Sequence, residues 1–240
     1  MKYITAENLT EYAFLNEDTL VLPLRGICVD FHGYTDTTTF DKSPDTAREL
    51  GEAGIAWVFP YYSPWAWMSA SSREYNEQVL DAVYERLHAD ESIPLLVSGG
   101  SMGGMTALNY LIYGKRKAVA CALNCPVTDV CRIFEDAPYM RRSILSAHIL
   151  EEDALSAVLS RYSPVEFCDR LPHIPYFIVF GECDTYFMQT QMPPMEEKLK
   201  EHHIAHTLLI QPQMGHCNIE QFPDAQRAYN DFIISNLHFV

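Results

Sequence analysis

The sequence predicts an α/β fold in which a mostly parallel sheet of about 6–8 strands carries helices on both faces. Short apolar runs alternate with amphipathic segments along the chain, as in a sheet covered by helices. These runs are apolar on both faces and too short for helices, as expected of strands buried between two helical layers. The 240 residues, 48% of them hydrophobic, suffice for one well-buried core, so we expect a single domain over residues 1–240.

The apolar runs are the predicted strands. They occupy residues 26–31, 55–59, 94–98, 118–123, 175–180 and 206–210. A further strand is expected near residues 19–24, and residues 12–15 could pair with it.

Helix signals lie between these runs. Ser43 followed by Pro44 has the pattern of an N-cap with a first-turn proline. Residues 71–74, Ser-Ser-Arg-Glu, form a capping-box pattern that predicts the start of a long helix. Residues 194–203 and 224–237 are predicted to form two more helices.

One segment does not fit this alternation. Residues 130–172 lie between two predicted strands and exceed what a single crossover helix needs. Their amphipathic stretch, 140–159, predicts a small helical insertion after the strand that ends near Leu123. We expect this insertion to form a modest lid.

Composition excludes several classes of protein. The formal net charge of −15 would repel phosphate backbones and anionic lipids, so we expect neither a nucleic-acid nor a membrane partner. The N-terminal stretch MKYITAENLTEYAF has no apolar run, and nothing approaches the roughly 18 apolar residues of a membrane-spanning helix. Together with an odd, irregularly spaced set of seven cysteines, this predicts a cytoplasmic protein with reduced thiols.

The sequence predicts no metal and no cofactor. Cys121 and Cys125 are spaced like metal ligands, but no second Cys or His pair stands at zinc-site spacing. No nucleotide-binding glycine motif or P-loop occurs.

The strongest chemical signal is the segment Gly-Gly-Ser-Met-Gly-Gly at residues 99–104. It follows a predicted strand and precedes an apolar helix, which is the setting in which G-x-S-x-G is a nucleophile motif. The sharp turn strains the serine backbone and requires glycine neighbours. Ser101 is therefore the predicted nucleophile.

A serine hydroxyl needs a base, and the base needs a carboxylate that orients it. His216 follows the last predicted strand and Asp184 follows the strand before it. The carboxyl ends of parallel strands meet at one edge, so both should lie near Ser101. Asp129 and Glu182 are the rival acids.

The oxyanion of an acyl-transfer reaction needs two backbone N–H donors. Met102, directly after Ser101, supplies one. The other is expected from Tyr34, or from Gly33, in the turn after the first long strand. His32 is expected to brace this turn by hydrogen bonding.

Aromatic residues near these positions predict a substrate wall. Trp65 and Trp67 follow the second long strand, and Tyr186 lies beside Asp184. Packing of the tryptophans in the core is an equally good interpretation. Arg141 and Arg142 could meet a substrate carboxylate, although a solvated basic pair is the simpler interpretation.

Taken together, the His32-Gly33 turn, the 99–104 motif, Gly181-x-x-Asp184 and Gly215-His216 resemble the α/β-hydrolase superfamily. Residues 99–104, Tyr162-Ser163-Pro164 and the stretch 194–216 are most similar to prolyl oligopeptidase-like catalytic domains and compact carboxylesterases. The resemblance implies hydrolysis of an ester or amide through an acyl-enzyme, without metal or cofactor.

Two departures favour a small carboxylesterase over a peptidase. No N-terminal propeller precedes the domain, and the turn at residues 32–35 lacks the longer glycine run of many lipase-like esterases. We therefore expect a small-molecule ester substrate. A peptidase or acyl-aminoacyl hydrolase with the same triad is the alternative, and a catalytically silent ligand-binding protein is the alternative from another class.

Overall fold

The computed structural model describes residues 3–237, and within them seven strands form one sheet in the order β1-β3-β2-β4-β5-β6-β7. Neighbouring strands are parallel except β1 and β3. This confirms the predicted fold class. The strands are β1 (Ala13–Leu15), β2 (Gly26–Phe31), β3 (Ile55–Pro60), β4 (Leu95–Gly100), β5 (Ala118–Asn124), β6 (Tyr176–Gly181) and β7 (His206–Gln211).

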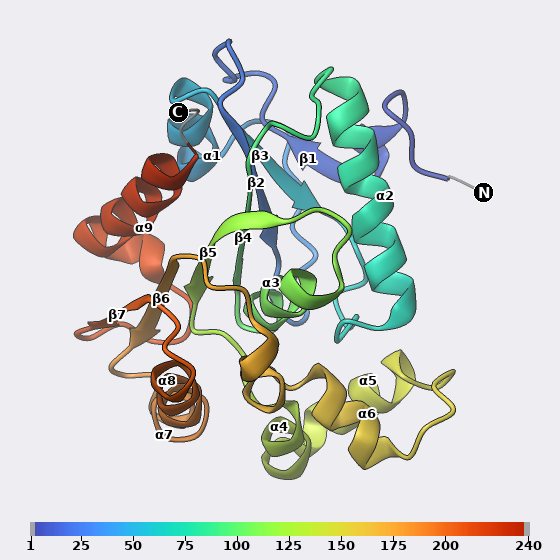
Figure 1. Cartoon of the computed structure of the whole chain (residues 1–240), viewed down its shortest axis with the longest axis vertical. Coiled ribbons are helices and arrows are strands. Elements are labelled where there is room, and N and C mark those ends of the chain that lie inside the picture. The colour runs from blue at the N-terminus through green and yellow to red at the C-terminus, as the bar shows by residue number, and fades with distance from the viewer. Residues whose placement is uncertain (1–2, 238–240) are drawn as a thin grey trace.

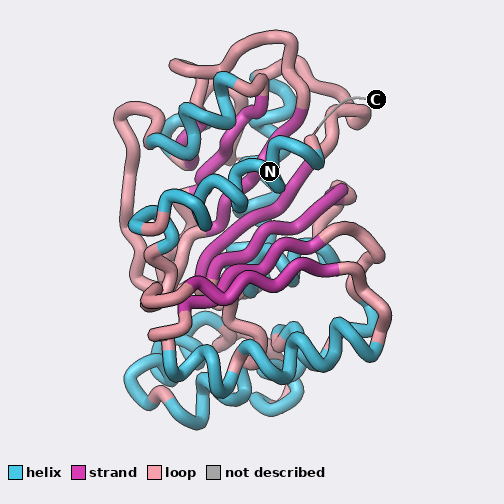
Figure 2. Tube along the Cα trace, turned by 90° about the vertical axis from the view of Figure 1, so that its left-hand side faces the viewer, coloured by secondary structure: helices cyan, strands magenta, loops and turns pink. Residues whose placement is uncertain are grey.

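Helices cover both faces of the twisted sheet (Figures 1 and 2). The first and last helices pack together on one face, where Asn230 donates a hydrogen bond to Glu49. The connection from β2 to β3 moves toward one edge of the sheet, whereas the connections that lead to β4, β5, β6 and β7 move toward the other edge. Because such crossovers are right-handed, the helices of the second group lie on the opposite face. The helices are α1 (Asp45–Glu52), α2 (Ala70–Arg86), α3 (Met102–Tyr113), α4 (Val130–Asp136), α5 (Pro138–Ala147), α6 (Leu155–Tyr162), α7 (Thr185–Thr190), α8 (Met192–Glu201) and α9 (Pro223–Asn236).

The core lies on both faces of the central strands. Every residue of β3 and of β6 is buried, whereas edge strand β7 has no fully buried residue. Burial on both faces explains why the central strands are continuous apolar runs in the sequence.

The strand expected near residues 19–24 does not form. β1 pairs antiparallel with β3 instead, with Ala13 opposite Pro60. Val21 and Leu22 are solvent-exposed, and Pro23 has no N–H to donate to a ladder. The prediction of this strand was therefore wrong: its apolar residues are exposed, and Pro23 interrupts the hydrogen bonding that a strand needs.

Two helix starts differ from the expected ones. α1 begins at Asp45, with Pro44 in the capping position. α2 begins at Ala70, and Ser69 caps it by accepting a hydrogen bond from the Ser72 N–H. The predicted capping box at residues 71–74 thus lies inside the helix, because neighbouring serines compete for one capping position.

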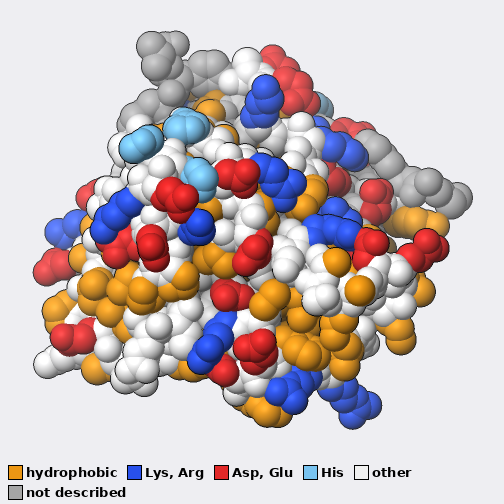
Figure 3. All heavy atoms as spheres, turned by 60° about the horizontal axis from the view of Figure 1, so that its bottom comes forward, with side chains coloured by type: hydrophobic (Ala, Val, Ile, Leu, Met, Phe, Trp, Pro, Cys, Tyr) orange, Lys and Arg blue, Asp and Glu red, His pale blue; other side chains and the backbone are white. Residues whose placement is uncertain are grey.

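The helical insertion lies between β5 and β6, at the bottom of Figure 1. It consists of α4, α5 and α6, so the amphipathic stretch 140–159 is divided between two helices with a turn between them. The bottom of Figure 1 comes forward in Figure 3, where hydrophobic side chains gather among charged ones. Its predicted role as a lid stays a prediction.

None of the helices within residues 3–237 combines the length and the apolar character that crossing a membrane requires.

Candidate active site

Ser101 lies on a sharp turn between β4 and α3. Its backbone has φ +55° and ψ −122°, a strained combination for a residue with a side chain. A Cβ on Gly103 would lie 1.8 Å from the Phe31 carbonyl oxygen, so only glycine allows α3 to start so close to β2. The predicted strand-turn-helix motif is thus present, and it holds the Ser101 hydroxyl above the edge of the sheet.

Backbone hydrogen bonds fix this turn to the end of β5. The Ser101 N–H donates to the Asn124 carbonyl at 3.0 Å, and the Val127 N–H donates to the Ser101 carbonyl at 2.9 Å. The serine backbone is therefore anchored on both sides before any substrate arrives.

Ser101, His216 and Asp184 form one hydrogen-bonded chain. The distance from Ser101 Oγ to His216 Nε2 is 2.9 Å, and that from His216 Nδ1 to Asp184 Oδ2 is 2.5 Å. Burial lowers the pKa of the His216 imidazole, but its hydrogen bond to the Asp184 carboxylate and the nearby Cys125 thiol act in the opposite direction. The net effect raises the pKa of His216 above its usual value. The buried Asp184 carboxylate thus stabilises an imidazolium next to Ser101.

The loops after β6 and β7 are packed against each other, which brings Asp184 and His216 together. The Cys183 N–H donates to the Met214 carbonyl at 2.8 Å. A Cβ on Gly181 would lie 2.4 Å from the Gly215 carbonyl oxygen, so glycine permits this close approach. A larger residue at the end of β6 would push the histidine loop away.

Asp184 has a second role as the N-cap of α7. Its Oδ1 accepts a hydrogen bond from the Phe187 N–H at 3.4 Å, which leaves Oδ2 for His216. The Phe187 ring lies 4.3 Å from the imidazole ring. The carboxylate and the ring together restrict the imidazole orientation.

Neither rival acid reaches His216. Asp129 caps α4 by accepting from the Arg132 N–H at 2.9 Å. Glu182 is exposed and accepts from the Gln213 N–H. Among the described side chains, the carboxylate hydrogen-bonded to the imidazole is that of Asp184.

The predicted oxyanion donors lie around Ser101. Met102 is the first residue of α3, where N–H groups have no partner within the helix. Gly33 lies against the serine, since a Cβ built on it would be 3.6 Å from Ser101 Cβ, and Tyr34 follows it. The buried His32 ring stacks on Tyr62 and reaches the carbonyl oxygens of Gly33 and Tyr62, each at 3.0 Å, so it braces the turn.

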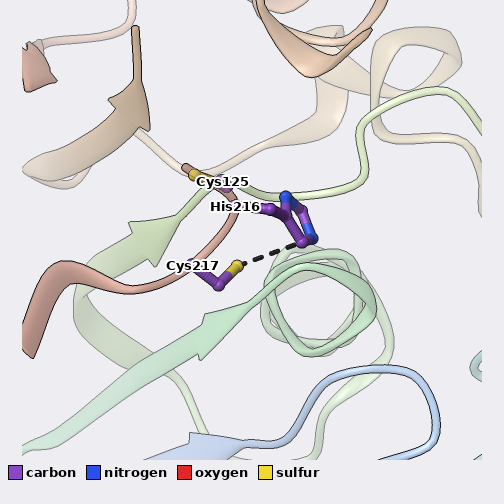
Figure 4. Close-up of side chains that lie close together, drawn as sticks. All are labelled: Cys125, His216 and Cys217. Carbon is purple, nitrogen blue, oxygen red and sulfur yellow. Dashed lines mark hydrogen bonds between the residues drawn. The ribbon is translucent and has the colours of Figure 1, made fainter. Parts of the chain in front are cut away.

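Two thiols flank the histidine, which sequence reasoning missed (Figure 4). Cys217 Sγ lies 3.7 Å from His216 Nε2. Among the described residues, Cys125, Cys217 and His216 place potential metal ligands within 4.8 Å of one another. Both imidazole nitrogens are already hydrogen-bonded, to Asp184 and Ser101, so a metal here would compete with the triad. The adjacency of Cys217 and His216 in sequence was the available signal.

The predicted substrate residues have different surroundings. Trp65 is half exposed and lines a cavity beside Tyr34. Trp67 is 1% exposed, contacts the Tyr34 ring and donates from Nε1 to Ser143 Oγ at 2.9 Å, so it supports this cavity from beneath. Tyr186 is half-buried, packs on Phe187 and lies near Asp136.

No protein-family model matches the sequence, and no curated protein matches it. Solved structures do resemble it. An S-formylglutathione hydrolase from Agrobacterium tumefaciens is 16% identical and has a TM-score of 0.68, with 94% of this chain and 88% of that chain covered. Esterase B from Lactobacillus rhamnosis is 13% identical, with a TM-score of 0.69 and coverage of 99% and 84%.

A puromycin-hydrolyzing peptidase of Mycobacterium tuberculosis is 16% identical and has a TM-score of 0.72. The match covers 95% of this chain but 38% of that chain. Topology, nucleophile turn and structural neighbours agree, and the chain therefore has the α/β-hydrolase fold.

Proposed function

We propose that this chain is a serine hydrolase that cleaves a small carboxylic ester through an acyl-enzyme. The observation that carries the proposal is the continuous hydrogen-bonded chain from Ser101 Oγ through His216 to Asp184. The esterase and the S-formylglutathione hydrolase that share the fold support a hydrolase.

In the acylation step, Ser101 Oγ attacks the ester carbonyl carbon while His216 Nε2 takes the hydroxyl proton. For this role the imidazole carries its single proton on Nδ1, and this N–H donates a hydrogen bond to Asp184 Oδ2. The buried carboxylate then stabilises the imidazolium that forms. The N–H groups of Met102 and Tyr34 bind the oxyanion of the tetrahedral intermediate.

Collapse of this intermediate breaks the bond to the alcohol, which leaves with the proton from His216 Nε2. In the second half of the reaction a water molecule attacks the carbonyl carbon of the acyl-serine, and His216 takes a proton from this water. The carboxylic acid leaves and Ser101 regains its proton. His216 thus acts as base and acid in turn, which fits the position of Nε2 at 2.9 Å from Ser101 Oγ.

A peptidase or acyl-aminoacyl hydrolase is the second candidate, because a peptidase is among the proteins that share the fold. The two activities share one acyl-enzyme chemistry, so the triad does not distinguish them. Turnover of p-nitrophenyl esters compared with that of aminoacyl p-nitroanilides separates them. We expect the esters to be the better substrates.

The proposed function is tested by Ser101→Ala. Loss of the nucleophile is expected to lower p-nitrophenyl butyrate turnover by about 10⁴- to 10⁶-fold. The melting temperature should not fall, because the hydroxyl supports no other described side chain than His216. A folded Ser101→Ala protein with wild-type turnover would refute the mechanism, and wild-type protein without ester or amide turnover would favour a silent binding protein.

A further inference from the structure

A cavity of about 610 Å³ opens beside the proposed oxyanion turn. Its walls come from the loop between β3 and α2, from the start of α2 and from α5 of the insertion. Tyr34 lines it, and the preceding Gly33 lies against Ser101. A substrate group that extends from the reacting ester past Tyr34 would therefore enter this cavity.

The walls of the cavity combine hydroxyl-bearing side chains with aromatic and alanine side chains, and the charged residue among them is a cation. Among the described lining residues, five are serines and one is an arginine, Arg142, while none carries a carboxylate. The whole chain has a formal net charge of −15, whereas the residues that line this cavity carry a net positive charge. Such a site attracts an anion, and hydroxyl groups can donate further hydrogen bonds to it.

Arg142 differs from the arginine next to it. Arg141 donates to the carbonyl oxygens of Phe134 and Glu135 at 2.6 and 2.7 Å, which fixes it to α4. Arg142 is solvent-exposed at the wall of the cavity and makes no ion pair or hydrogen bond with a described residue. Its guanidinium therefore keeps its fork of N–H donors for a ligand.

We propose that this cavity binds a carboxylate carried by the ester substrate, with Arg142 as its counter-ion. Guanidinium and carboxylate match in shape and can form two parallel charge-assisted hydrogen bonds. This inference rests on the proposed function, since it assigns a substrate class to the same site. It makes Arg142 a specificity residue and gives it no part in the chemical steps.

The test compares carboxylate esters with carboxamide esters of the same shape. One pair places the group on the acyl side, as mono-p-nitrophenyl adipate and its terminal amide. The other places it on the alcohol side, as p-acetoxybenzoate and p-acetoxybenzamide. Wild-type protein is expected to prefer the carboxylate member of at least one pair by about tenfold in kcat/KM, because the cavity is open to solvent and the ion pair is only partly desolvated.

Arg142→Gln should remove this preference, chiefly through KM, and Arg142→Lys should retain part of it because lysine keeps the charge but not the fork. Arg141→Gln is the matched control: it changes the net charge equally, lies outside the cavity, and should keep the wild-type preference. A wild-type preference that survives Arg142→Gln, or the absence of any preference in both pairs, would overturn the inference.

A fluorophosphonate probe separates this inference from the proposed function. If the probe labels Ser101 and the carboxamide esters are cleaved without any carboxylate preference, only the carboxylate site is refuted. If Ser101 is not labelled and none of the esters is cleaved, the proposed function fails and the inference fails with it.

Discussion

The ends of β5 and β6 are built alike but have different surroundings. Each strand is followed by an aspartate that caps the next helix, Asp129 for α4 and Asp184 for α7. In each, one carboxylate oxygen accepts a hydrogen bond from a backbone N–H three residues later. From the sequence, both positions are acceptable for the acid of a triad.

The second carboxylate oxygen distinguishes them. That of Asp184 lies 2.5 Å from His216 Nδ1, because the loops after β6 and β7 touch. Asp129 is instead held beside Gln191, since its N–H donates to Gln191 Oε1. The end of β6 thus contacts the histidine of the proposed triad, whereas the end of β5 leads into the insertion that lines the cavity.

The most direct test of this difference replaces each aspartate by asparagine in a separate variant. Asparagine caps helices about as well as aspartate, so both helices should keep their N-caps. Asp184→Asn should lower ester turnover by about 10⁴-fold, because the amide favours the wrong imidazole tautomer and cannot stabilise the imidazolium. Asp129→Asn should stay within a few-fold of wild type.

Initial rates of p-nitrophenyl butyrate hydrolysis measure this difference, and thermal melts confirm that both variants are folded. Equal turnover in the two variants, or a loss confined to Asp129→Asn, would contradict the assignment of Asp184.

A second comparison is between Trp65, which lines the cavity, and Trp67, which is buried beneath it. Trp67 is buried and hydrogen-bonded to Ser143, so Trp67→Ala should lower the free energy of unfolding by about 3–5 kcal/mol. Trp65 is 50% exposed, and Trp65→Ala should cost less than about 1 kcal/mol.

Urea unfolding measures both effects. Trp65→Ala should instead change the relative rates of acetyl, butyryl and octanoyl esters, because an acyl chain that enters the cavity would contact this exposed wall residue. An unchanged ranking together with a large loss of stability would place Trp65 in the core.

The smallest expected effect on turnover concerns the link between the two strand ends. Gln191 is fully buried, and its Oε1 accepts from the N–H groups of Thr128 and Asp129, each at 2.9 Å. Gln191→Ala leaves one buried and one part-buried donor unpaired and should lower the free energy of unfolding by about 2–4 kcal/mol. Turnover per folded molecule should stay within about threefold of wild type, since Gln191 makes no contact with the triad; a much larger loss would show that this link also sets the triad geometry.

Much of the fold and the triad follows from local patterns. Apolar runs located the central strands because burial on both faces leaves a continuous signal. Ser101, Asp184 and His216 were predicted because each follows such a strand, and the carboxyl ends of parallel strands meet at one edge. These positions depend on the parallel direction of the strands, which the alternation of strands and helices indicates.

The direction in which a side chain points from its loop or helix could not be predicted from the sequence. Whether Trp65 or Trp67 points into the core, and whether Arg141 or Arg142 is bound to α4, depends on the rotation of one short segment against another. The approach of Cys125 to His216 joins the ends of β5 and β7, which are far apart in sequence. Such contacts arise from packing between elements, and single-sequence patterns carry no record of it.

The central claim is that Ser101 becomes acylated by its substrate, and trapping the acyl-enzyme tests it directly. Wild-type protein mixed with p-nitrophenyl butyrate and quenched with acid during the first turnovers should gain the mass of one butyryl group. Peptide mapping should place that group on Ser101, and Asp184→Asn should acquire it far more slowly than Asp129→Asn. Ester cleavage without any covalent mass, or with the acyl group on another residue such as Cys217, would contradict the account.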